Sequence, residues 1–453
     1  MNTPRWYEQK HEVYEGKELY PLEVPILSLQ ERDRRWAAVR EKMYYRRLGA
    51  LVVVGTDFNS SMAMANVRYL TQVGSIVGAY AMFPAVGDPV VWTGARHMNI
   101  PTAAYRHVPG HWIEDMRPKE GVAGIAAELK NRGLDKARIG AIGYSDLLTP
   151  TSNLPASFLD DLRRALPDAI ITDETSLLEE SRLIKSAEEL EFLRKAGAIA
   201  RRRVEKLIEV AKPGVTEAEV WAAMEYESIV AGGEPITFNI LSSAPITGPN
   251  ADGRVLNMVH GSEVPLTATQ RKLEEGDLII SEFHSAYAGY LAATEFSVFL
   301  GEPPEPLQRL HDAAAEIVRM AKDLMLPGEP LIHALSGFHR FIEDQGMDWL
   351  ELGFHGHGLA SPEFPACVYR VEDLGSIGRD GITDMLFREN MVFGINIDIH
   401  DPSWRRDVGV MLGDMVGITE HGAEYYCNIP LDTFALPGTV HERPSGLEAA
   451  RAD

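Results

Sequence analysis

Residues 275–295 read EGDLIISEFHSAYAGYLAATE, which is a turn, an apolar run and a second run that starts at a glycine. The first run begins apolar and becomes polar near Glu282, and the second run ends at Glu295. Apolar runs of this length that follow a glycine turn are typical of β-strands. Glu282 and Glu295 are therefore the acids of these strands that can face one pocket, although each can equally be a solvated strand end.

Residues 390–400, NMVFGINIDIH, form another candidate strand with a polar face. Because side chains alternate across a strand, Asn396, Asp398 and His400 lie on one face and apolar residues on the other. The segment 413–422, GDMVGITEHG, also reads as a strand that enters a turn. Its first acid, Asp414, can be structural or functional.

Two histidines flank a glycine in residues 354–358, FHGHG. Either histidine alone is most often a satisfied core or surface residue. The spacing of two residues does not fit a zinc-binding helix, but it places both rings on one face of a strand or turn. The glycines let a ligand approach the backbone closely.

The first part of the chain alternates between strands and helices. A charged helix is predicted at 30–47, and the β-branched run Ala50–Gly55 is too short for a helix and predicts a strand. Further strands are expected at 79–83, 89–92, 139–142 and 169–172, with helices at 121–131 and 155–165. This alternation predicts an α/β domain.

A different pattern starts after residue 174. Ser186 with Glu189, and Thr216 with Glu219, have the spacing of helix capping boxes, so two helices are predicted there. A strand is expected at 236–241 and more strands after residue 276. Two further helices are separated by Pro327-Gly328. Two helix pairs, each followed by strands, predict a pseudo-duplicated α+β domain.

The composition limits the functional class. Of 453 residues, 44 are Lys or Arg and 66 are Asp or Glu, so the formal net charge is −22. This charge argues against nucleic acid and anionic membranes as partners, and it favours a small-molecule substrate. Two cysteines exclude a disulfide framework, and the charged start lacks the apolar core of a signal peptide. No run is long enough for a membrane span, so we expect a cytoplasmic protein.

The order of these segments resembles the creatinase/prolidase/aminopeptidase P family. Residues 181–189, SRLIKSAEE, resemble the entry to the family's catalytic domain, and residues 66–71, NVRYLT, look like its N-terminal motif. The other matching segments follow in the family's order: Gly276-Asp277, Gly289-Tyr290, Gly356-His357-Gly358, 390–393, Asp414 and 419–422.

The resemblance implies a small N-terminal α/β domain before a pita-bread catalytic domain, and a homodimer. The expected boundaries are an arm at 1–27, the N-terminal domain at 28–175, the catalytic domain at 176–435 and a tail at 436–453.

The departures from the family pattern concern metal binding. The resemblance implies two divalent ions held by two Asp, one His and two Glu. The Asp positions here hold Ser281 (or Glu282, with a slip of one residue) and Ala293, and the His is kept as His357. The Glu positions hold Asn396 and Gly413. Because divalent ions need anionic oxygens, we expect no dinuclear metal site and no cofactor. A rearranged set such as Glu282, Glu295, His357 and Asp398 is the alternative.

The same departures resemble creatinase, which works without metal. Creatinase has an alanine at the position of Ala293 and a glutamate at that of Glu295. Its catalytic histidine lies upstream of the Gly-Asp turn, where His260 stands here, sixteen residues before Gly276. His260 can also be a plain loop histidine. As a catalytic residue it would take a proton from water and pass it to the leaving nitrogen.

The other site residues follow from this hypothesis. Glu282 and Glu295 would hold a cationic group by charge-assisted hydrogen bonds, and His357 and Asp398 would orient substrate or water. Asn396 lies on the same strand face as Asp398. Arg68 can bind a substrate carboxylate, although such an arginine is more often a structural ion-pair residue.

The sequence therefore predicts a metal-independent hydrolase of an amidine, guanidino or amide C–N bond in a small cationic substrate. The second reading is a metal-dependent Xaa-Pro aminopeptidase or dipeptidase with a rearranged metal site. The third is an inert binding protein, or a lyase, on the same fold.

Overall fold

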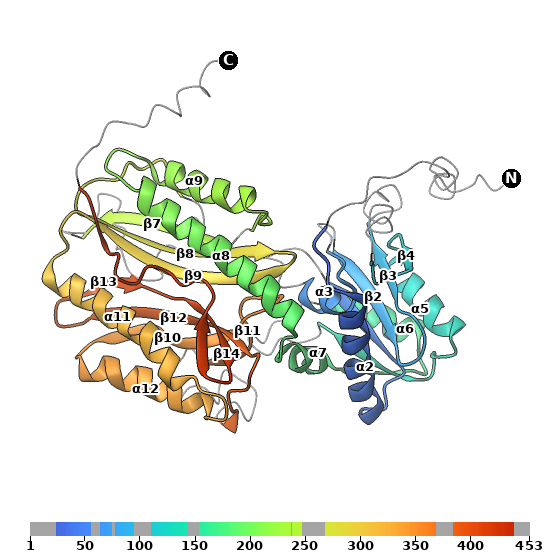
Figure 1. Ribbon diagram of the computed structural model, residues 1–453. Coiled ribbons are helices and arrows are strands. Elements are labelled where there is room, and N and C mark those ends of the chain that lie inside the picture. Colours follow the sequence, from blue (N-terminus) through green and yellow to red (C-terminus); the bar gives the residue numbers. More distant parts are fainter. Residues whose placement is uncertain are drawn as a thin grey trace, which may run out of the picture.

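The computed structural model describes residues 24–55, 64–74, 78–94, 110–143, 154–236, 238–246, 268–367 and 384–438. Two domains lie side by side, with the C-terminal domain at the left and the N-terminal domain at the right of Figure 1. Of the predicted terminal segments, residues 1–23 and 439–453 lie outside the described residues. The predicted domain boundaries stay predictions.

The N-terminal domain is built on a mixed sheet with β1 (Ala50–Gly55) near its centre. β1 pairs antiparallel with β2 (Ala79–Pro84) and parallel with β5 (Arg138–Ile142). The sheet has the order β4-β3-β2-β1-β5-β6, completed by β3 (Val90–Thr93), β4 (Asp115–Arg117) and β6 (Ile170–Asp173).

Both faces of β1 are covered, which explains its continuous apolar run. The face of β1 that carries Val52 packs against α5 (Gly121–Asn131) and α6 (Ala156–Ala165). Val53, on the other face, belongs to the cluster that includes side chains of α2 (Leu29–Tyr45) and α3 (Ala65–Thr71). The segment 66–71, expected as a family motif, thus lies on α3, and α7 (Thr175–Arg182) leads into the second domain.

The C-terminal domain repeats one arrangement, as expected. α8 (Ala187–Val210) and α9 (Glu217–Val230) lie over a sheet of order β16-β9-β8-β7, and Figure 1 shows this half at the top. α11 (Glu305–Leu324) and α12 (Leu331–Asp344) lie beside the second sheet, of order β11-β10-β12-β14-β15, with β13 on β12. The predicted fold class is confirmed.

The strand bounds set the positions of the site residues. The first sheet contains β7 (Asn239–Pro245), β8 (Asp277–Tyr287), β9 (Tyr290–Leu300) and β16 (Ala435–Leu436). The second contains β10 (Asp348–Gly356), β11 (Glu363–Cys367), β12 (Val392–Asp401), β13 (Arg405–Met411), β14 (Met415–Thr419) and β15 (Gly422–Tyr425). β7 starts at Asn239, three residues later than the strand expected at 236.

Both predicted capping boxes are present. The Ser186 side chain accepts from the Glu189 backbone N–H and the Glu189 side chain accepts from that of Ser186, and Thr216 and Glu219 repeat this exchange. These bonds satisfy amides that the first helical turn leaves without a partner.

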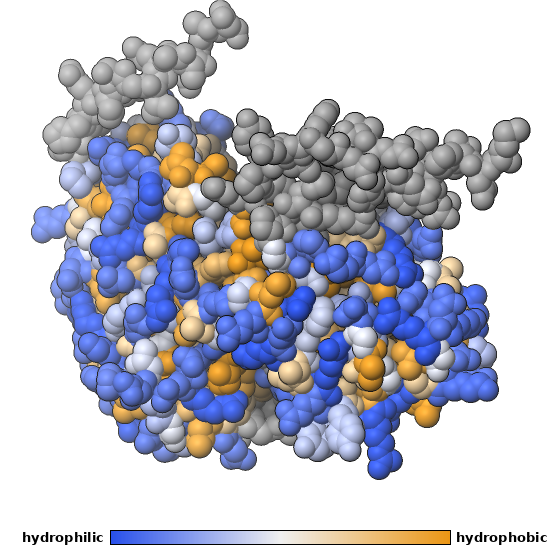
Figure 2. Space-filling model, turned by 45° about the vertical axis from the view of Figure 1, so that its right-hand side comes forward, coloured by the Kyte–Doolittle hydropathy of each residue, from blue (hydrophilic) through white to orange (hydrophobic). Residues whose placement is uncertain are grey.

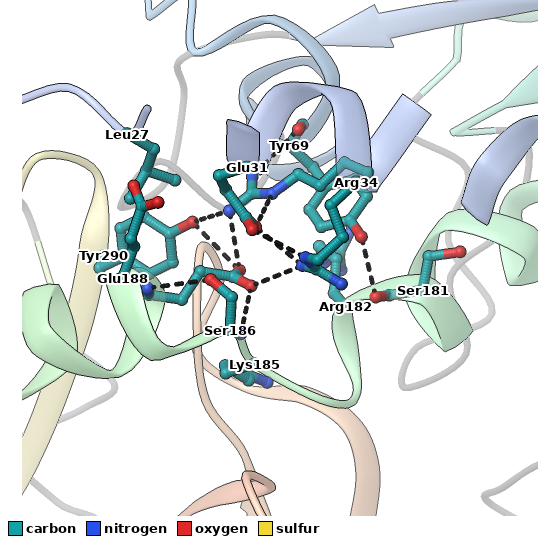
Figure 3. A network of polar contacts seen from close by, with 12 residues as sticks. Leu27, Glu31, Arg34, Tyr69, Ser181, Arg182, Lys185, Ser186, Glu188 and Tyr290 are labelled. Atoms are coloured by element: carbon teal, nitrogen blue, oxygen red, sulfur yellow. Dashed lines mark hydrogen bonds and ion pairs between the residues drawn. The ribbon is translucent and has the colours of Figure 1, made fainter. Parts of the chain in front are cut away.

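A buried ionic network joins the two domains at the start of α8 (Figure 3). Arg35 of α2 is fully buried and lies 2.6 Å from Glu31 and 3.1 Å from Glu189. Arg35 also donates to the Tyr290 hydroxyl of β9 over 2.8 Å. Glu189 thus caps a helix and joins the domains, because its carboxylate also accepts from Tyr290.

The surface agrees with the acidic composition. Hydrophilic residues cover most of the coloured part of the face drawn in Figure 2, with hydrophobic residues between them. No helix in the described part of the chain is long and apolar enough to cross a membrane.

Candidate active site

One wall of the candidate site is the inner face of β8 and β9. Glu282 lies directly opposite Glu295 in the register of these strands, and His284 lies opposite Ala293. Because side chains alternate, these four residues share one face. The other face of β8 packs on α8, where the Arg203 guanidinium lies over the Phe283 ring at 4.3 Å.

The register also decides between Ser281 and Glu282, which the sequence left open. Ser281 points away from this face, since its hydroxyl donates to the Phe296 carbonyl over 2.8 Å. Glu282, rather than Ser281, therefore lies on the inner face of β8.

The opposite wall is formed by β10 and β12. Glu351 lies opposite Asp398 and His355 lies opposite Gly394, so their side chains share a face with Asn396. The Asn396 side chain hydrogen-bonds both Glu351 and His355. Asn396, at a position where the resemblance implies a glutamate, thus connects an acid to an imidazole.

Glu295 joins the two walls. Its Oε2 accepts from the Ile397 backbone N–H over 3.1 Å, and its backbone pairs with Gly413. A Cβ added at Gly413 would lie 2.2 Å from the Ile395 carbonyl oxygen and 3.1 Å from Glu295 Oε2. The absence of a side chain at 413 therefore leaves room for the carboxylate that β9 supplies.

The four acids form a cluster of like charges, which we call the carboxyl cluster: Glu282, Glu295, Glu351 and Asp398. Burial, and then the charge of Glu351, raises the pKa of Glu282 to about 8. Burial and the neighbouring acids raise the pKa values of Glu295 and Asp398 well above their usual range. Burial also raises the pKa of Glu351.

Two oxygens of the carboxyl cluster, Glu295 Oε1 and Asp398 Oδ1, are buried without a hydrogen-bond partner among the described residues. A buried carboxylate oxygen without a partner is costly, and three nearby acids increase the cost. The cluster is therefore an environment that favours a bound cation.

Three imidazoles lie next to the acids. The rings of His355 and His357 stack at 4.7 Å, and His284 lies edge-on to His357 at 6.3 Å. Burial lowers the pKa of His284 to about 3 and that of His355 to about 4. Burial, followed by the nearby His355 and His284, also lowers the pKa of His357 well below its usual value.

The loop after His357 is held by a buried ion-pair triad. The Glu363 carboxylate lies 3.1 Å from Arg182 and 3.1 Å from Lys185, and it accepts from the Ala360 N–H. Although burial alone would raise the pKa of Glu363, Lys185 and Arg182 hold it below its usual range. The segment 181–189, recognised in the sequence, thus anchors the histidine loop.

The structure brings together five of the predicted site residues: Glu282, Glu295, His357, Asn396 and Asp398. Arg68 lies elsewhere, since its guanidinium is 3.5 Å from Glu234, which also accepts from the Gly289 N–H at the β8–β9 turn. His260 lies outside the described residues. The predicted roles of these seven residues stay predictions.

Asp414 has a structural role. Its carboxylate accepts from the backbone N–H groups of Cys427, Asn428 and Ile429. Burial raises its pKa to about 6, although these three hydrogen bonds lower it.

Sequence reasoning missed His284, Glu351 and Ser361. His284 follows Glu282 by two residues and Glu351 precedes His355 by four, so strand alternation alone places each on the inner face. Ser361 Oγ lies 3.1 Å from the Nε2 atoms of both His284 and His357. No sequence signal indicates this contact, because it joins positions 77 residues apart.

Comparison with known proteins identifies the family. Residues 35–184 match the Creatinase/Prolidase N-terminal domain, and residues 191–420, half of the chain, match Metallopeptidase family M24. The chain belongs to metallopeptidase family M24. This membership confirms the resemblance that the sequence suggested, and the C-terminal domain has the pita-bread fold.

Two similar curated proteins are named as dipeptidases, the first as a probable one. The probable dipeptidase PepE of Mycobacterium bovis is 25% identical over 307 residues, which cover 67% of this chain and 74% of that protein. The Xaa-Pro dipeptidase of Pyrococcus horikoshii is 26% identical over 276 residues, 60% of this chain and 70% of that protein.

Solved M24 structures share the fold. The prolidase from Pyrococcus horikoshii has a TM-score of 0.67 at 19% identity, covering 87% of this chain and 98% of that one. The dipeptidase PepE from Mycobacterium ulcerans has a TM-score of 0.68 at 22% identity, covering 91% and 100%.

These findings correct the predicted function. The prediction of a metal-independent, creatinase-like hydrolase is wrong, because the matched family is one of metallopeptidases and the two relatives described above are named as dipeptidases. The second reading of the sequence, a peptidase with a rearranged metal site, agrees with them better. The error has a physical source: Ala293, Asn396 and Gly413 reveal which anionic groups are missing, but not which carboxylates occupy the space.

The M24 metal arrangement does not fit at its usual positions, since Ala293 and Gly413 offer no side-chain oxygen and Asn396 no charge. Within the described ranges, no three His, Cys, Asp or Glu side chains already surround one point as metal ligands do. The donor chemistry of the carboxyl cluster nevertheless fits a hard divalent cation, because it offers carboxylate oxygens of which two lack partners.

Proposed function

We propose that the protein is a metal-dependent peptidase that hydrolyses short peptides such as dipeptides and Xaa-Pro peptides, with a metal site rearranged from the family pattern. The observation that carries the proposal is the carboxyl cluster, which lies where β9 meets β12 and contains two buried oxygens without described partners. The family membership and the dipeptidase relatives support the same reaction class.

Glu282, Glu295 and Asp398 are the residues that would hold the metal ion, because they come from three strands and influence one another's charge. A divalent ion held by these residues would supply Lewis-acid chemistry for hydrolysis of a peptide bond. His357, which the sequence placed in the rearranged set, contacts Ser361 through Nε2, and its Nδ1 is buried without a partner in the described part of the chain.

The remaining polar groups position the substrate. A short peptide carries an N-terminal ammonium at neutral pH, and the acidic walls attract it through charge-assisted hydrogen bonds. On this proposal, Glu351 and Asn396, which share the inner face of the β10–β12 wall, receive that end of the peptide. The homodimer that the resemblance implies stays a prediction.

The test is a peptidase assay with metal loading. Protein treated with chelator and dialysed is supplied with Mn²⁺, Co²⁺ or Zn²⁺ and offered Ala-Pro, Ala-Ala and Gly-Pro, and its metal content is measured by mass spectrometry. We expect hydrolysis that requires added metal. Asp398→Asn should lower both activity and metal content at least about tenfold, whereas the exposed Asp344→Asn should change neither. Failure of every metal-loaded sample to cleave any dipeptide would overturn the proposal.

A further inference from the structure

His284 lies at a distinctive point of the inner face. Its cross-strand partner is Ala293, and Glu282 precedes it by two residues on the same face. The alanine leaves space opposite the ring, where the resemblance implies an aspartate in other members. An imidazole therefore borders the space that the missing acid vacates.

Three contacts fix this ring. The Phe238 ring stacks on it at 4.5 Å with an angle of 22°, and Ser361 Oγ contacts its Nε2 at 3.1 Å. Behind the strand, the buried Arg203 donates to the His284 carbonyl oxygen. Phe238 thus covers one face of the His284 ring, Ser361 contacts one ring nitrogen, and Arg203 fixes the backbone.

Ser361 contacts two imidazoles but has one hydroxyl proton. Its Oγ is 3.1 Å from His284 Nε2 and 3.1 Å from His357 Nε2. A hydroxyl donates one hydrogen bond, so at least one of the two rings must carry a hydrogen on Nε2 and donate to Oγ. Ser361 thereby restricts the tautomers of both rings.

The other ring nitrogen of His284, Nδ1, is buried without a hydrogen-bond partner in the described part of the chain. The residue as a whole is 4% exposed. A buried ring nitrogen without a partner is unfavourable, and the contacts above prevent the ring from turning away. This arrangement is typical of a group held ready for a ligand.

We propose that His284 is a substrate-binding residue whose Nδ1 hydrogen-bonds a peptide in the candidate active site, and that Ser361 is the positioning residue that holds its ring. The inference rests on the proposed peptidase function and adds one contact to it. It makes no use of the metal ion and assigns His284 no role in proton transfer.

Two near-isosteric variants separate the roles of the two ring nitrogens. The amide of glutamine reaches the place of Nε2, so His284→Gln keeps a contact with Ser361 and loses Nδ1. The shorter asparagine places its amide near Nδ1, so His284→Asn keeps the group that would bind the substrate. A merely structural role through Ser361 predicts that Gln is tolerated and Asn is not, whereas the proposal predicts that Gln weakens substrate binding more than Asn does.

The measurements are kcat and KM for Ala-Pro and Ala-Ala with metal-loaded protein. They are combined with calorimetric binding of Ala-Pro to metal-free protein carrying Glu295→Gln, a readout independent of turnover. We expect His284→Gln to raise KM and weaken binding about tenfold, the usual effect of one lost hydrogen bond. His284→Asn keeps a group near Nδ1 but loses the contact with Ser361, so it should raise KM and weaken binding less than His284→Gln does. Ser361→Ala should raise KM, and Ser361→Thr, which keeps the hydroxyl, should restore it.

The outcomes distinguish this inference from the proposed function. If the unchanged protein cleaves dipeptides and His284→Gln binds Ala-Pro as tightly as before, the inference is overturned while the peptidase function stands. If the unchanged protein cleaves no dipeptide, the proposed function fails and the inference fails with it. Circular dichroism spectra of each variant show whether a loss reflects unfolding.

Discussion

The domain boundary and the candidate site both bury several ionisable groups, but only at the boundary are groups of opposite charge paired. At the boundary, Arg35 lies between Glu31 and Glu189, so each charge has a partner of opposite sign. In the carboxyl cluster four acids face one another, and two of their oxygens lack partners among the described residues.

The difference separates groups that hold the fold from groups kept for a ligand. Removing one partner of a buried ion pair leaves an uncompensated charge, which is strongly destabilising. Removing one acid from a cluster of like charges relieves repulsion instead. Substitutions at the domain boundary should therefore lower the stability of the protein, whereas substitutions in the carboxyl cluster should lower its activity.

The largest expected effect on stability is at the boundary. Arg35→Met removes the buried cation between Glu31 and Glu189 and should lower the free energy of unfolding by about 3–5 kcal/mol. Urea titration followed by circular dichroism measures it. The control is Arg34→Met, because Arg34 is half-exposed and pairs with the same Glu31, and it should cost less than about 1 kcal/mol. Equal losses from both variants would contradict the comparison.

A second variant tests the site. Glu295→Gln should lower kcat/KM at least about a hundredfold, equivalent to about 2.7 kcal/mol of transition-state stabilisation. The free energy of unfolding should not fall, because the amide oxygen can still accept from the Ile397 N–H. Peptidase assays and urea titration of the same preparation check both. The matched control is Glu343→Gln, on an exposed turn of α12. If the Glu295→Gln protein is destabilised but active, the carboxyl cluster stabilises the fold and does not serve catalysis.

The smallest expected effect concerns His311, a buried titratable group outside both regions. Its ring stacks on Phe434 at 4.4 Å, and burial lowers its pKa to about 4. An unfolded histidine titrates near pH 6.5, so below that pH the unfolded state binds a proton that the folded state does not. The stability should be full above about pH 6.5 and fall toward pH 4, by up to about 3 kcal/mol from this group.

Urea titrations between pH 4 and 7.5 check this effect. His311→Phe should lose less stability on acidification than the unchanged protein, because it removes the group that the unfolded state protonates. The exposed His421→Phe should retain the original pH dependence. If the free energy of unfolding depends on pH equally in His311→Phe and in the unchanged protein, the His311 ring does not contribute to that dependence.

Local interactions made much of the fold predictable. The capping boxes of α8 and α9 act within four residues, so the sequence placed both helix starts correctly. The run Ala50–Gly55 specified β1, since a short β-branched run buried on both faces fits a central strand. The three-residue β4 and the seven-residue α3 were not predicted, because elements this short have almost no periodicity of their own.

The sequence by itself determined the family order of segments and the two-domain architecture, and it indicated three of the four acids of the carboxyl cluster. Only the tertiary structure decided what surrounds them. It fills the space beside Gly413 with the Glu295 carboxylate, pairs Arg68 with Glu234, and sets Ser361 between two imidazoles. The physical reason is the distance between these partners along the chain. All but one pair, Ser361 with His357, are 77 or more residues apart. Tertiary packing therefore brings them together, and no local sequence pattern indicates the contact.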